Sequence, residues 1–94
     1  MRLTNDEVNT LKASLSMLSK TAQLFLFGSR VDDTKRGGDI DLLVVSSELT
    51  LRDLRKIKFD FFDNFGEQKI DIVLDDGKKV EPFIELIKAK AVLI

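Results

Sequence analysis

Two aspartates, Asp39 and Asp41, lie one residue apart at the start of an apolar segment that ends at Val45. Alternate side chains of a β-strand point to one face, so both carboxylates would share a face while Ile40 is buried on the other. Like charges held this close repel each other unless a cation lies between them. A solvated pair of acids is the alternative interpretation, but the nearby core strand favours a cation-binding pair.

The composition restricts which cation the pair can bind. The 94 residues include no cysteine and no histidine, which removes thiolate and imidazole both as metal ligands and as catalytic groups. Any metal must therefore be held by oxygen atoms, and oxygen-only sites favour Mg²⁺, Mn²⁺ or Ca²⁺ over zinc. The lack of cysteine also fits a cytoplasmic protein.

Length and charge limit the architecture and the partners. A chain of 94 residues predicts a single domain, residues 1–94, near the small end of the sizes that fold alone. The net charge of −1 gives no overall field that would attract nucleic acid, so no direct nucleic-acid binding is expected. The polar first residues lack a signal-peptide core, and no apolar run approaches the ~20 residues of a membrane span.

Helical and strand patterns alternate along the chain, which predicts an α/β domain with one sheet. Thr4 with Glu7 forms a capping-box pattern, Thr50 suits the start of a second helix, and Gly66 suits its end. The core stripe of that second helix is expected to be Leu51, Leu54, Ile57, Phe61, Phe62 and Phe65. The expected helices are 5–19, 51–64 and 82 to about 90, and the expected strands are 22–28, 39–46, 69–74 and a short terminal 91–94.

The second helix also carries the chain's one basic cluster, Arg52, Arg55, Lys56 and Lys58. Acidic residues are interleaved with it, so we interpret it as a solvated face. Phe59 lies beside this face rather than on the core stripe. It is either a contact for a partner protein or is covered within the domain, and the sequence leaves both alternatives open.

A turn after the first strand supplies groups that suit a phosphate. Gly28 would let the main chain approach a phosphate closely, because no Cβ intervenes. Ser29 offers a hydroxyl and a main-chain N–H, and the start of a short helix there would favour an anion. Arg30 is the nearest cation, with Lys35 and Arg36 further along. An ordinary strand-ending turn is the alternative, and a P-loop is excluded because no Gly-Lys-Ser/Thr sequence follows.

A third aspartate interrupts the apolar strand 69–74. Asp71 lies between Ile70 and Ile72, and if its strand neighbours that of Asp39 and Asp41, the three carboxylates form one site. Two Mg²⁺ ions about 3.5–4 Å apart are typically held by such carboxylates in phosphoryl-transfer chemistry. The alternative for Asp71 is a surface position on a half-exposed strand.

These segments together resemble a known family. Gly28-Ser29-Arg30 followed by Asp39-Ile40-Asp41-Leu42 resembles the signature of the polymerase-beta-like nucleotidyltransferases, and Ile70-Asp71-Ile72-Val73 resembles their third-carboxylate strand. The short chain is similar to their minimal nucleotidyltransferase branch, from about residue 5 to the end. The resemblance implies the polymerase-beta-like nucleotidyltransferase fold, an α/β (α+β) fold of order αβαβαβ with a mixed sheet and helices packed on one face.

The resemblance also implies an activity. The family transfers a nucleoside monophosphate, commonly AMP from ATP, onto a hydroxyl, with two Mg²⁺ ions (or Mn²⁺) held by residues that correspond to Asp39, Asp41 and Asp71. Asp71 would also assist the attacking hydroxyl, and Gly28 and Ser29, with Arg30 nearby, would bind the triphosphate. Minimal members are often antitoxins partnered with a HEPN-type toxin, and some adenylylate it. The alternative is a catalytically idle antitoxin that neutralises its toxin by binding alone.

Overall fold

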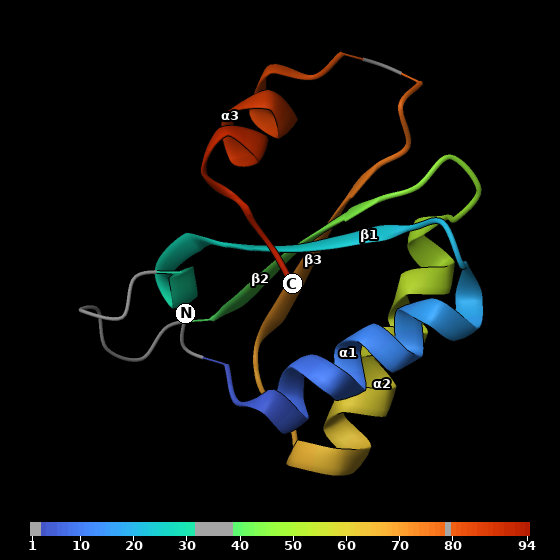
Figure 1. Ribbon diagram of the computed structural model, residues 1–94, viewed down its shortest axis with the longest axis vertical. Helices are drawn as coiled ribbons and strands as arrows, with labels where there is room; N and C mark the ends of the chain where they lie inside the picture. The colour runs from blue at the N-terminus through green and yellow to red at the C-terminus, as the bar shows by residue number, and fades with distance from the viewer. Residues whose placement is uncertain (1–2, 32–38, 79) are drawn as a thin grey trace.

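The computed structural model describes residues 3–31, 39–78 and 80–94, and its elements follow the alternation predicted from the sequence. The predicted α+β architecture is confirmed, and each predicted helix and strand is present within one or two residues of its expected bounds (Figure 1). The elements in chain order are α1 (Asn5–Leu18), β1 (Gln23–Phe27), the 3₁₀ turn η1 (Gly28–Val31), β2 (Ile40–Val45), α2 (Leu51–Phe65), β3 (Ile70–Asp75), α3 (Pro82–Lys90) and β4 (Val92–Leu93).

The two long helices begin at the predicted caps. The Thr4 hydroxyl accepts from the Glu7 N–H at 3.1 Å, and the Glu7 carboxylate accepts from the Thr4 N–H at 2.9 Å. Thr50 and Asp53 form the same reciprocal pair at the start of α2. These bonds satisfy amide groups that a helix leaves unpaired at its first turn. The caps therefore fix the residue at which each helix starts.

The four strands form one mixed sheet in the order β3-β2-β1-β4. β1 pairs antiparallel with β2 and with β4, whereas β2 and β3 run parallel. A parallel pair requires a crossover connection, which α2 provides. β2 therefore lies between β3 on one side and β1, which is followed by the turn η1, on the other.

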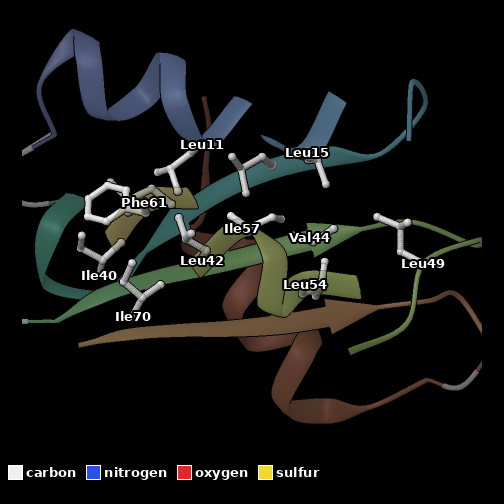
Figure 2. Packing of buried hydrophobic residues seen from close by; sticks show 12 residues of the cluster. Leu11, Leu15, Ile40, Leu42, Val44, Leu49, Leu54, Ile57, Phe61 and Ile70 are labelled. Carbon is white, nitrogen blue, oxygen red and sulfur yellow. The ribbon is translucent and has the colours of Figure 1, made fainter. Parts of the chain in front are cut away.

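The main core lies between the sheet and the helices α1 and α2 (Figure 2). Its buried side chains include Leu11 and Leu15 of α1, Ile57 and Phe61 of α2, and Leu42 of β2. The predicted packing of helices on one face of the sheet therefore holds for α1 and α2. The third helix, α3, lies apart from them (Figure 1) and contacts the other face, where its Lys88 forms an ion pair with Asp75 of β3.

One predicted core residue of α2 is exposed instead. Leu54, Ile57 and Phe61 are buried as expected, but 64% of Leu51 is exposed, so its assignment to the core stripe is wrong. Leu51 is the first residue of α2, so it extends past the end of the packed stripe. Phe59 is also exposed, at 61%, which excludes the alternative that the domain itself covers it.

Candidate functional site

The register of the sheet places Asp41 directly opposite Asp71. β2 and β3 run parallel and pair these two residues, one position after the pair Ile40 and Ile70. Paired residues of neighbouring strands lie about 4.8 Å apart and share a face of the sheet. Because Ile40 and Ile70 belong to the core beneath α1 and α2, the two aspartates project from the opposite face. Asp39, two residues before Asp41, completes the group.

The three carboxylates act on one another electrostatically. Burial, and after it the negative charges of Asp71 and Asp39, raises the pKa of Asp41 above its ordinary value. The ammonium group of Lys69 acts in the opposite direction and lowers this pKa. The ionised form of Asp41 is therefore disfavoured, and a cation placed beside it would relieve the repulsion.

Gly28 lies against the Asp41 side chain. The last residue of β1, Phe27, pairs with Asp41, so the chain turns beside that aspartate. A Cβ at position 28 would lie 2.3 Å from Asp41 Oδ2 and 3.2 Å from its Cγ. Gly28 also has a φ of +77°, which L-residues rarely adopt. Glycine is thus required here both by the backbone conformation and by the position of the carboxylate.

The other residues predicted to bind phosphate follow Gly28 in η1. The main chain of Ser29 directly follows Gly28, which lies against Asp41. Arg30 is half-buried in the same turn. Lys35 and Arg36 lie outside the described residues. The structure therefore brings Gly28 and the Ser29 main chain to the same end of the sheet as Asp39, Asp41 and Asp71.

Sequence reasoning missed one charged residue of this group. The Lys69 ammonium lies 3.3 Å from Asp39 Oδ2, and the resulting hydrogen bond, with the charges of Asp39 and Asp71, raises the pKa of Lys69. The sequence does indicate the pairing of Lys69 with Asp39 once the register of the two strands is chosen. If Asp41 pairs with Asp71 on parallel strands, the residues two positions earlier, Asp39 and Lys69, are also opposite each other.

The three aspartates supply only part of the ligands that a divalent cation requires. In the described part of the chain, no three side chains are arranged to hold one metal ion together. Asp41 and Asp71 form a facing pair, and Asp39 is occupied by Lys69. Mg²⁺ is commonly bound through one or two carboxylates together with substrate phosphates and water, rather than by a complete protein cage. The pair therefore fits Mg²⁺ that arrives with a nucleotide.

Lys69 should compete with a cation for Asp39. We expect Lys69→Gln to tighten Mg²⁺ binding in the absence of nucleotide by about two- to fivefold, because exposed ion pairs are weak but not negligible. Calorimetric titration of Mg²⁺ into both proteins measures the difference. Lys90→Gln, which removes an exposed lysine of α3, is the matched control. Equal or weaker Mg²⁺ binding by Lys69→Gln would show that Lys69 does not occupy the ion's position.

The family model for the nucleotidyltransferase domain matches residues 8–93. The chain belongs to the nucleotidyltransferase domain family. The match spans α1 to β4 and thus includes Gly28, all three aspartates and Lys69. No curated protein matches the chain.

Membership gives the site its general chemistry. Nucleotidyltransferases typically use a divalent metal and a nucleoside triphosphate, and this agrees with a carboxylate pair on one face beside a glycine turn. The match supports the resemblance to the polymerase-beta-like superfamily that the sequence motifs carry. Within the described residues, none of the helices has the length and apolar character needed to cross a membrane.

Proposed function

We propose that this nucleotidyltransferase moves AMP from ATP, with Mg²⁺, onto a hydroxyl group of a partner protein. The observation that carries the proposal is the pairing of Asp41 with Asp71 across β2 and β3, on the face that Gly28 borders. Asp39 and Asp41 would hold metal, and Asp71 would hold metal and orient the acceptor. Gly28 and Ser29, with Arg30 nearby, would seat the triphosphate.

The proposed reaction forms one bond and breaks one bond. The acceptor oxygen attacks the α-phosphorus of ATP, and the bond from that phosphorus to the bridging oxygen of the β-phosphate breaks, so pyrophosphate leaves with the electron pair. The hydroxyl proton passes to a carboxylate, for which Asp71 is placed at the outer side of the pair, or to water. Mg²⁺, when bound, would neutralise charge on the triphosphate and help to align it.

A protein acceptor is supported by apolar side chains on the surface. Phe83 and Leu86 lie on the exposed side of α3, 61% and 70% accessible, while Ile84 and Ile87 of the same helix are buried. Exposed apolar groups gathered on one helix are typical of surfaces that contact another protein. We propose a HEPN-type toxin as the partner, with this chain as its antitoxin in a minimal nucleotidyltransferase pair.

A second function is favoured by a different observation. Lys69 forms an ion pair with Asp39, and no group of three described side chains is arranged for a metal. This would suit an idle antitoxin, which neutralises its partner by binding alone. Both functions require a complex with the partner, so binding to it does not distinguish them.

Label transfer separates the two functions. The purified protein is incubated with Mg²⁺, ATP labelled at the α-phosphate and a candidate HEPN toxin, and covalent label on the toxin is measured. The enzyme transfers label, and the double substitution Asp39→Asn/Asp41→Asn abolishes this transfer. If the wild-type protein blocks the toxin while no label reaches it, the idle function holds and the transferase proposal fails.

A further inference from the structure

The outer edge of β3 has unpaired main-chain groups. β3 is the last strand of the sheet on its side, and the Ser46 N–H donates to the Asp75 carbonyl at 3.0 Å. Alternate residues of a strand direct their N–H and C=O groups to opposite sides, so Ile70, Ile72 and Leu74 direct theirs away from β2. Among the described residues, no main-chain hydrogen bond reaches these outward groups. The edge can therefore accept another strand.

A groove follows this edge between α2 and α3. Its larger part has a volume of about 580 Å³, and its smaller part, of about 160 Å³, shares Leu51 and Ile72 with it. In Figure 2, β3 is the outermost strand, with Leu54 and Leu49 on the side of the sheet that α2 covers. The side chains that line the groove include Leu51, Leu54, Ile72, Leu74 and Ile84.

The groove has an apolar wall, two cations beside its smaller part, and Asp75, Asp76, Lys78 and Glu81 along its larger part. Leu51, an exposed apolar residue of α2, forms part of the wall, so a ligand in the groove would cover its side chain. Arg55 and Lys58 line the smaller part next to Ile72. Neither has an ion pair with any described residue. The smaller part of the groove, next to Ile72, therefore offers two cations to a ligand, and their charge is complementary to acidic side chains there.

We propose that the β3 edge binds an extended, acidic segment of the acceptor protein as a fifth strand of the sheet. This inference rests on the proposed function, because it names how the acceptor reaches the site. Main-chain bonds to Ile70, Ile72 and Leu74 would hold the segment, as in other complexes in which a peptide adds to a sheet edge. Arg55 and Lys58 would select acidic residues in it.

The register of the added strand determines where its side chains point. A residue opposite Asp71 shares the face of Asp71 and Asp41, because directly opposed residues lie on one face. With strands about 4.8 Å apart, its Cα lies about 10 Å from that of Asp41, and its side chain projects from the same face as the Asp41 carboxylate. Its two neighbours point to the α2 side, and the one opposite Ile72 lies next to Leu51, Arg55 and Lys58. A long hydroxyl-bearing residue such as tyrosine at this position, with acidic or apolar neighbours, would match this placement.

Peptide binding tests the inference without nucleotide or metal. The probe is a fluorescein-labelled nine-residue peptide with a central tyrosine, a glutamate on each side of it and valine and threonine alternating outward. A second peptide replaces both glutamates by lysine, and a third is the first with alternate main-chain nitrogens methylated. We expect the first to bind at least about ten times more tightly than the other two, measured by fluorescence anisotropy.

A charge reversal in the groove provides the decisive comparison. Arg55→Glu/Lys58→Glu should reverse the preference, so that the lysine peptide binds more tightly than the glutamate peptide. Arg52→Glu/Lys56→Glu changes the same helix outside the groove lining and should keep the original preference. The inference is overturned if the methylated peptide binds as well as its parent, if the reversed variant still prefers glutamate, or if no peptide binds at millimolar concentration.

The outcomes for binding and for transfer are distinguishable. If the peptides behave as expected while no label is transferred to any acceptor, the groove is a binding site and the proposed reaction fails. If a toxin is labelled while the peptides do not bind, the reaction stands and the groove is not the acceptor's site. Moving the tyrosine by one position turns it toward α2. This change should abolish nucleotide transfer from ATP to the peptide while leaving its binding unchanged.

Discussion

Asp41→Asn should make the protein more stable and remove its response to Mg²⁺–ATP. The substitution keeps the shape of the side chain but removes the charge that Asp71 and Asp39 repel and that burial disfavours. Repulsion between unit charges about 5 Å apart in watery surroundings is about 1 kcal/mol. In a domain of this size, that gain corresponds to a rise in Tm of roughly 4–8 °C.

The same substitution should impair ligand binding and transfer. Wild-type protein at a ligand concentration 100 times its Kd gains about 2.7 kcal/mol of stability, and Asp41→Asn should gain none of it. Nucleotidyl transfer should fall by at least about 100-fold, because a proposed ligand of the metal is lost. Asp63→Asn, an exposed position on α2, should change neither property. A fall in Tm for Asp41→Asn would contradict the repulsion between these carboxylates, and an undiminished response to Mg²⁺–ATP would contradict the role of Asp41 in binding the metal.

Gly28→Ala should impair the site more than it impairs the fold. The backbone at Gly28 has a φ of +77°, and an L-residue in this region costs about 1–2 kcal/mol. The new Cβ would also lie 2.3 Å from Asp41 Oδ2. The carboxylate can escape this contact by rotating, so the additional cost appears as a displaced Asp41 rather than as unfolding. We expect loss of Mg²⁺–ATP binding by about 100-fold with only modest loss of Tm.

Gly77 provides a control for the backbone effect alone. Its φ is +75°, and a Cβ there would meet no atom within 4 Å. Gly77→Ala should therefore lower the free energy of unfolding by a similar amount, about 1–2 kcal/mol, and leave nucleotide binding intact. Denaturant unfolding and Mg²⁺–ATP titration of both variants make the comparison. Equal nucleotide binding by the two variants would mean that Gly28 has no role beyond its backbone conformation.

The order and bounds of the elements could be predicted because local signals agree. Thr4 with Glu7 and Thr50 with Asp53 mark helix starts, and Gly66 ends α2 with a φ of +81°. The predicted core stripe of α2 is wrong at Leu51, because periodicity shows which side of a helix is apolar but not how far the sheet extends beneath it. That limit is a tertiary property, and at Leu51 it leaves an apolar side chain in the groove.

The site could be predicted in its residue types but not in its contacts. Asp39, Asp41 and Asp71 are visible as acids within apolar strands. Their convergence depends on the parallel register of β2 and β3, which no local pattern specifies. The ion pair of Lys69 with Asp39 and the close approach of Gly28 to Asp41 follow from that register. Each becomes apparent only when strands distant in sequence are placed side by side.

The central claim is that Asp39, Asp41 and Asp71 bind a nucleoside triphosphate through Mg²⁺. Calorimetric titration with α,β-methylene ATP, an analogue that cannot transfer its nucleotide, tests this claim without any acceptor. The account predicts saturable binding that requires Mg²⁺, disappears in EDTA and is absent from Asp39→Asn/Asp41→Asn. Binding of the same strength by that double variant, or no binding to the wild type at millimolar analogue with Mg²⁺, would contradict it.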